Sequence, residues 1–195
     1  MSGAQENSAI DHPTLVAALG NRSIVMIGLM GCGKSSVGRR LATTLDLSFV
    51  DADEEIERAA GKSIPDIFEE HGEAHFRERE SLVIGRLLRD GPQVLATGGG
   101  AYMRASTREI IGAIGVSVWL RAELQVLMRR VLRRDNRPLL RTADPEEKMR
   151  SLMEERYPIY GLADLTVDSR DTSHDVVVKN ILTGLHRHFA KEARP

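Results

Sequence analysis

Short apolar runs alternate with amphipathic segments along most of this chain. The apolar runs predict five strands, at 23–28, 47–50, 93–97, 116–120 and 165–168. Residues at helical spacing predict helices at 34–46, 53–60, 73–89, 104–113, 122–134, 145–160 and 174–189. Strands that alternate with helices in this way predict an α/β fold, a five-stranded parallel sheet with helices on both faces. Ligands of such a sheet bind at the carboxyl ends of its strands.

The first residues of the chain differ from the rest, and this difference gives the expected bounds of the domain. Residues 1–22 are polar apart from a short apolar patch at 15–19, and we expect a partly flexible extension with one packed helical turn. Residues 23–195 are expected to form a single domain. Ser63, with an acidic residue three positions on, and Asp144, followed by Pro145, are typical of helix starts.

The loop after the first strand carries the strongest chemical signal. It reads Gly28-Leu29-Met30-Gly31-Cys32-Gly33-Lys34-Ser35, between an apolar run and a helical pattern, which is the context that a phosphate-binding loop requires. Its glycines bring backbone N–H groups close to phosphate, and the helix N-terminus adds a positive dipole end. We expect Lys34 to contact the β- and γ-phosphates of a nucleotide and Ser35 to contact Mg²⁺.

Acidic residues follow the second strand. In an extended Asp51-Ala52-Asp53 both carboxylates would face one site, where one could serve Mg²⁺ and the other a substrate hydroxyl. Asp53 alone is equally consistent with an N-cap of the helix 54–60. The phosphate-binding loop upstream favours the functional interpretation of Asp53.

Three consecutive glycines, Gly98, Gly99 and Gly100, follow the third strand. A plain turn needs one glycine, so this triplet indicates a place where something approaches the backbone closely.

Arginines gather in two segments. Most charges in 76–80 are expected to be a solvated helix face, and the run at 129–137 indicates that anions lie nearby. This run lacks interleaved aromatic residues, which argues against a nucleic-acid surface. Residues 135–144 lie between two helices, where a lid over the phosphates would be expected.

Neither the histidine pair nor the cysteine predicts a site of its own. Gly72 interrupts the spacing between His71 and His75, so exposed histidines are expected there rather than a metal site. A catalytic role for Cys32 would need a neighbouring base, and none is evident.

Composition narrows the expected partners and compartment. The chain has 27 basic and 28 acidic side chains, a formal net charge of −1, which gives no sign of nucleic-acid or membrane binding. One cysteine fits a reducing compartment, and no apolar stretch is long enough for a membrane span. We therefore expect a cytoplasmic protein, and we expect it to be a monomer.

Several motifs occur together and in order. They are G-L-M-G-C-G-K-S-S-V-G at 28–38, D-A-D-x-x-I-E at 51–57, F-R-x-x-E at 76–80, T-G-G-G at 97–100, R-P-L-L at 137–140 and R-x-x-x-Y at 156–160. Over residues 23–185 the chain resembles the shikimate kinases. The resemblance implies a P-loop NTPase-like three-layer sandwich of the nucleoside monophosphate kinase type. It also implies ATP- and Mg²⁺-dependent phosphorylation of the 3-hydroxyl of shikimate in aromatic amino-acid biosynthesis.

The resemblance also implies a role for each matched residue. Lys34, Asp53 and Arg137 would be catalytic, and Ser35 and Asp51 would organise Mg²⁺. The implied nucleotide contacts are Gly28, Met30, Gly31, Cys32, Gly33, Lys34, Ser35, Ser36, Arg130 and Arg137. The implied shikimate contacts are Asp53, Arg77, Gly98, Gly99, Gly100 and Arg156, with both arginines on the carboxylate.

Three rival functions remain to be compared with this one. A regulatory GTPase would need N-K-x-D and D-x-x-G, and neither occurs in the sequence. A gluconate kinase would share the loop but would not account for Asp51-Ala52-Asp53 together with Arg77 and Arg156. A non-catalytic nucleotide or shikimate sensor is disfavoured by intact Lys34, Asp53 and Arg137.

Overall fold

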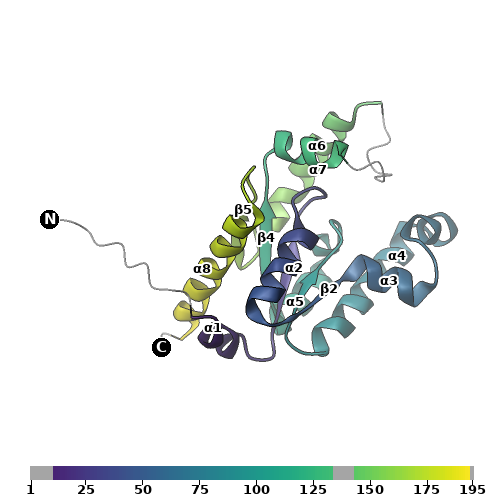
Figure 1. The fold of residues 1–195 in the computed structure, drawn as a ribbon. Helices are drawn as coiled ribbons and strands as arrows, with labels where there is room; N and C mark the ends of the chain where they lie inside the picture. The colour runs from purple at the N-terminus through teal and green to yellow at the C-terminus, as the bar shows by residue number, and fades with distance from the viewer. Residues whose placement is uncertain (1–10, 134–142, 194–195) are drawn as a thin grey trace.

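A computed structural model describes residues 11–133 and 143–193 of the chain (Figure 1). Its centre is one parallel sheet with the strand order β2-β3-β1-β4-β5. The strands are β1 (Ser23–Ile27), β2 (Ser48–Asp51), β3 (Gln93–Ala96), β4 (Gly115–Arg121) and β5 (Leu165–Asp168). Met26 of β1 pairs with Ala96 of β3 on one side and Val118 of β4 on the other. The predicted five-stranded parallel sheet is confirmed.

Helices cover both faces of this sheet. They are α1 (His12–Leu19), α2 (Lys34–Leu45), α3 (Ala52–Ala60), α4 (Ile64–Arg89), α5 (Ala105–Ile114), α6 (Leu124–Leu132), α7 (Pro145–Tyr160) and α8 (His174–Glu192), with a 3₁₀ turn η1 (Ala101–Met103). α2 packs beside α8, with α1 against both, whereas α5 packs beside α4 (Figure 1). Across the ranges that the structure describes, no helix combines the length and the apolar character that crossing a membrane requires.

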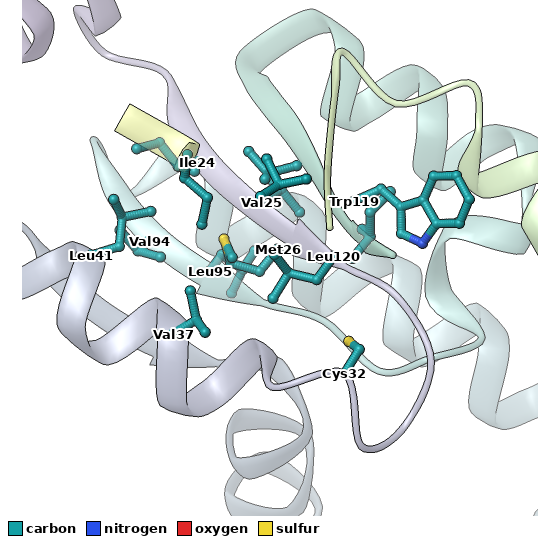
Figure 2. Close-up of a cluster of buried hydrophobic side chains, with 14 of the residues drawn as sticks. Ile24, Val25, Met26, Cys32, Val37, Leu41, Val94, Leu95, Trp119 and Leu120 are labelled. Carbon is teal, nitrogen blue, oxygen red and sulfur yellow. The ribbon is translucent and has the colours of Figure 1, made fainter. Parts of the chain in front are cut away.

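The core forms where β1 meets its neighbours. All five residues of β1 are buried, as expected for the central strand of a sheet covered on both faces. Figure 2 shows Val37 and Leu41 of α2 reaching toward the side chains of β1 and β3. These two residues are four apart and so share one face of α2. The core therefore fixes α2, and with it the loop that precedes this helix.

The N-terminal segment is more ordered than one packed turn. α1 spans two turns, starts with Pro13 in its first turn, and buries Leu15 and Leu19, which are four residues apart. Both leucines belong to the main core. Residues 1–10 of the expected extension lie outside the described residues.

α4 confirms the predicted interruption at Gly72. Its two helical parts meet at this residue, whose φ of 77° and ψ of 172° are not helical. The predicted caps are present, since Ser63 Oγ accepts from the Asp66 N–H at 3.3 Å and Asp144 Oδ1 accepts from the Glu147 N–H at 2.9 Å. A small second core of Ile56, Ile67 and Phe76 joins α3 to α4.

Candidate active site

The loops that follow β1, β2 and β3 meet at one edge of the sheet. These strands are neighbours in the order β2-β3-β1, and all run in the same direction. The register places Asp51 opposite Ala96, directly before Thr97 and the glycine triplet. The three predicted strand ends therefore lie side by side, as parallel strands require.

The loop after β1 has the backbone of a phosphate-binding loop. Gly28 has a φ of 139°, and a Cβ there would lie 2.8 Å from the Leu120 carbonyl oxygen and 2.9 Å from Cys32 Sγ. Only glycine fits this position. Lys34, the first residue of α2, donates from Nζ to the carbonyls of Gly28 at 2.8 Å and Leu29 at 3.2 Å. Its ammonium group thus lies over the loop that would hold the phosphates.

The other predicted nucleotide contacts follow the same backbone. Met30, Gly31, Gly33 and Ser36 are partly exposed along the loop and the first turn of α2. Cys32 is buried, and its carbonyl accepts a hydrogen bond from Ser169 Oγ at 2.7 Å. The Cys32 side chain therefore belongs to the core, and its backbone belongs to the loop.

A hydroxyl and a carboxylate meet where the sequence places the metal. Ser35 Oγ donates to Asp51 Oδ2 at 2.8 Å. Two oxygen ligands this close fit one Mg²⁺, which takes its remaining ligands from phosphates and water. Within 11–133 and 143–193 no group of three or more His, Cys, Asp or Glu side chains could hold a metal by itself. The Ser35 hydroxyl and the Asp51 carboxylate are nevertheless oxygen donors of the kind that Mg²⁺ prefers.

Asp51, and not Asp53, caps the helix after β2. Asp51 Oδ1 accepts from the Asp53 N–H at 3.1 Å, and α3 begins at Ala52. The capping interpretation of Asp53 is therefore wrong. The segment 51–53 is also not extended throughout, because Asp53 already lies in the first turn of α3. The two carboxylates consequently contact different partners.

Asp53 lies among charged groups beside the glycine triplet. A Cβ on Gly98 would be 2.8 Å from Asp53 Oδ1. Burial, followed by the carboxylate of Asp51, raises the pKa of Asp53 above its ordinary value of 3.8, and Lys34 and Arg77 oppose this shift by less. A carboxylate with a raised pKa next to two cations is well suited to accept a proton from a hydroxyl.

Arg77 is held by a buried carboxylate that the sequence analysis gave no role. Arg77 Nη1 donates to Glu80 Oε2 at 2.8 Å, and the Glu80 side chain is 2% exposed. Burial raises the pKa of Glu80, and the charge of Arg77 opposes this. Arg77 also lies over the Phe76 ring, with 5.1 Å from Cζ to the ring centroid. Glu78 and Arg79 are exposed, as the solvated-face prediction states.

The glycine triplet makes room for these charged groups. A Cβ on Gly98 would lie 2.7 Å from Glu80 Oε1, and one on Gly100 would overlap the Arg77 guanidinium. A Cβ on Gly99 would be 3.5 Å from Arg156 Nη1 and 3.9 Å from the Met30 nitrogen. The triplet thus borders Asp53, Arg77, Arg156 and the phosphate-binding loop together.

Arg156 on α7 has a hydrogen-bond donor that is unused within the described ranges. Its side chain is 11% exposed, and its buried Nε has no hydrogen-bond partner among the described residues. Glu80 Oε1 is likewise a buried polar atom without a partner in the described ranges. Buried polar groups of this kind are rare unless a ligand or water completes them. They lie against adjacent glycines of one triplet.

Arg130 lies against the phosphate-binding loop. It donates from Nη1 to Ser169 Oγ at 2.9 Å and from Nη2 to the Arg170 carbonyl at 2.7 Å, whereas Arg129 pairs with Asp171. The structure therefore settles which of the two neighbouring arginines faces the loop. Arg137 and residues 135–142 of the predicted lid lie outside the described residues.

Three residues that contact the site were not singled out from the sequence. Glu80 and Tyr160 end two of the recognised motifs, and their burial is the property that sequence spacing could not provide. Ser169 follows β5 and bonds the Cys32 carbonyl, a contact across 137 positions of the chain.

His71 and His75 lie with ring centroids 4.8 Å apart on either side of the bend at Gly72.

Comparison with known proteins agrees with this geometry. The family model for shikimate kinase matches residues 30–186. A shikimate kinase from Bradyrhizobium diazoefficiens is 57% identical over 178 residues, which cover 91% of this chain and 86% of that protein. The solved structure titled shikimate kinase from Acinetobacter baumannii in complex with shikimate has a TM-score of 0.82 at 38% identity, covering 89% of this chain and 97% of that one.

A gluconokinase from Sinorhizobium meliloti is a more distant structural neighbour. Its TM-score is 0.58 at 23% identity, covering 88% of this chain and 95% of that one, so this likeness concerns the fold alone. The fold is thus that of the P-loop kinases of small molecules. With a family model over most of its length and a relative at 57% identity, the chain belongs to the shikimate kinase family.

Proposed function

We propose that the described site binds ATP with Mg²⁺ on the Lys34 side of the loop and shikimate on the Asp53 side. As a shikimate kinase, the chain transfers a phosphoryl group from ATP to shikimate. The observation that carries the placement is the convergence of Asp53, Arg77 and Arg156 on one glycine triplet beside the phosphate-binding loop. We assign the 3-hydroxyl of shikimate as the acceptor.

The nucleotide half of the site neutralises phosphate charge. Lys34 would exchange its bonds to the loop carbonyls for bonds to the β- and γ-phosphates, and Arg130 would pack against the adenine. Ser35 and Asp51 would hold Mg²⁺, which supplies charge neutralisation at the phosphates when bound. Arg137 would contact the transferring phosphoryl group.

The substrate half positions the acceptor hydroxyl. Arg77 and Arg156 present two guanidinium groups, which match the planar carboxylate of shikimate. Holding that carboxylate at one end would place the ring hydroxyls at Asp53. Asp53 would then orient the attacking hydroxyl and accept its proton. Phosphoryl transfer depends mainly on such positioning and on charge stabilisation.

Replacing the loop lysine tests the nucleotide half. Lys34→Ala should lower kcat about a hundredfold or more, because a cation that stabilises the transferring phosphoryl group contributes several kcal/mol. A coupled ADP-release assay measures this loss, and Lys179→Ala, an exposed lysine on α8, is the matched control. Activity of Lys34→Ala within a few-fold of the control would remove Lys34 from the mechanism.

The same assay tests the acceptor. Shikimate should support rapid ADP release, whereas quinate, gluconate and the absence of an acceptor should give little. Gluconate turnover comparable to that with shikimate would favour the gluconate kinase alternative. Nucleotide binding without ADP release on any acceptor would favour a sensor.

A further inference from the structure

Tyr160 ends the same helix that carries Arg156, and it is completely buried. Its relative exposure is 0%, and its hydroxyl donates a hydrogen bond to the Gly99 carbonyl. Burial raises the pKa of the Tyr160 hydroxyl well above its usual value, an effect that the nearby charge of Arg156 reduces. The hydroxyl therefore remains protonated, and remains a donor, throughout the pH range in which enzymes work.

Gly99 is the point at which three parts of the site come together. Its Cα faces Arg156 Nη1 of α7, the Gly28 carbonyl and the Met30 nitrogen, each within 4 Å of a Cβ built there. Its carbonyl accepts the hydrogen bond from Tyr160. A single hydrogen bond thus ties the strand-end backbone of the substrate pocket to the helix that supplies a substrate-binding guanidinium.

Arg156 and Tyr160 are four residues apart and share one face of α7. The Tyr160 ring is locked from behind by Trp119 of β4, whose ring centroid is 5.9 Å away, and by Tyr157, at 6.3 Å. Side chains held by close packing have one preferred position. The distance between α7 and the glycine triplet is consequently set by the hydrogen bond of the Tyr160 hydroxyl.

We propose that Tyr160 is a positioning residue for the acceptor: its bond to Gly99 sets the distance between the Arg156 guanidinium and the glycine triplet, and so tunes binding of the shikimate carboxylate. The inference rests on the proposed role of Arg156. Tyr160 touches neither substrate in this scheme. It acts on shikimate through Arg156 and leaves the nucleotide half of the site unaffected.

Removing only the hydroxyl tests this role. Tyr160→Phe should raise the KM for shikimate about fivefold to tenfold, the size expected from one lost hydrogen bond. The KM for ATP should stay within twofold of that of the wild type. A purely structural role would instead lower the melting temperature and the amount of active enzyme while leaving the KM for shikimate unchanged, and this result would overturn the proposal.

The chain offers a matched control on the same helix. Tyr157 also donates its hydroxyl to a backbone carbonyl, that of Ala122, at a distance from the glycine triplet. Tyr157→Phe removes a comparable bond and should lower stability similarly, but it should leave both KM values within twofold of those of the wild type. Equal changes in the KM for shikimate in both variants would show a general loosening of α7, which contradicts the specific role.

A double-mutant cycle shows whether Tyr160 acts through Arg156. Arg156→Ala alone should raise the KM for shikimate, and adding Tyr160→Phe should raise it no further. Independent, additive effects would overturn the coupling between the two residues. If Arg156→Ala itself has no effect, the assigned role of Arg156 fails, and this is distinguishable from a failure of Tyr160 alone.

A modified acceptor gives a second readout. Shikimate in which a carboxamide replaces the carboxylate has lost the charge that Arg156 recognises. The wild-type enzyme should prefer shikimate over this analogue, and Tyr160→Phe should reduce the preference by about the same factor as its rise in KM. An unchanged preference would show that Tyr160 does not influence carboxylate recognition.

Discussion

The two aspartates after β2 have separate contacts, and these suggest separate roles. Asp51 bonds Ser35 and caps α3, whereas Asp53 faces the glycine triplet. Asp51→Asn keeps a side chain that can cap, because asparagine caps about as well as aspartate. It should nevertheless weaken Mg²⁺-dependent turnover, and raising the Mg²⁺ concentration should recover part of the rate. A rate that does not respond to added Mg²⁺ would contradict the metal role of Asp51.

Asp53→Asn should behave in the opposite way. It should lose shikimate phosphorylation, bind ATP nearly normally in a titration and gain nothing from added Mg²⁺. The pKa of Asp53 is raised in the folded state, so Asp53 ionises less readily there than in the unfolded chain. This difference lowers the stability of the fold progressively as pH rises from 3.8 through the raised pKa. The amide removes this cost, so the melting temperature at pH 7 should be unchanged or higher. Normal turnover would exclude Asp53 from the chemistry.

The same raised pKa predicts the shape of the pH profile. If ionised Asp53 is required, kcat/KM for shikimate should fall as pH falls, with a midpoint above the ordinary aspartate value of 3.8. Glu80 also has a raised pKa, so Glu80→Gln is the necessary control. The acidic limb should persist in Glu80→Gln. If the limb disappears there, the titrating group is Glu80 and not Asp53.

At the scale of single residues, the sequence predicted which residue types form the site but not which groups surround each of them. The phosphate-binding loop was predictable because its spacing has a physical mechanism. That Asp51 and not Asp53 caps α3 was not predictable, since it depends on a helix boundary one residue earlier than expected. The burial of Glu80 was also not predictable, because F-R-x-x-E does not show which charge faces inward.

Among the elements, α4 depends on one backbone position. At Gly72 the φ of 77° and ψ of 172° lie in a region that only glycine adopts readily, and a Cβ there would meet nothing within 4 Å. This bend separates the first turns of α4 from the segment that carries Arg77 and Glu80. Any cost of adding a Cβ is therefore backbone strain and not a steric clash.

Gly72→Ala should consequently destabilise the protein by about 1–3 kcal/mol. Gly112→Ala makes the matched comparison, since Gly112 lies within α5 with equally open space around it. In that helix alanine should stabilise by about 0.5–1 kcal/mol. Denaturant unfolding of both variants measures the difference. Equal stability of the two would mean that Gly72 is not under conformational constraint.

For the whole molecule, the alternation of apolar runs and helical segments predicted the sheet and its parallel strands. The order β2-β3-β1-β4-β5 depends on which strands pair, and pairing is set by packing between distant segments such as α2 and α8. The break in α4 at Gly72 was predictable, because glycine is typical of a helix end. α1 was underestimated because its two leucines are buried by the main core, a contact that the local sequence does not show.

We propose that the protein is a monomer. The large apolar side chains exposed in the described ranges are scattered over different elements, namely Leu82, Leu132, Leu162 and Val176. Single exposed apolar residues are normal on a protein surface and do not by themselves indicate an interface. Size-exclusion chromatography with light scattering should give a mass near 21.6 kDa. A mass of twice this value across dilution would contradict the monomer.

Trp119 gives the molecule a built-in optical probe of its acceptor side. It is the chain's single tryptophan, it is 5% exposed, and its ring lies 4.9 Å from the Tyr157 ring of α7 in an edge-on arrangement. Indole fluorescence depends on such neighbours, so its emission monitors how α7 sits against β4. If the acceptor binds at Arg156 as proposed, its arrival should change this emission in real time, without a dye and without turnover.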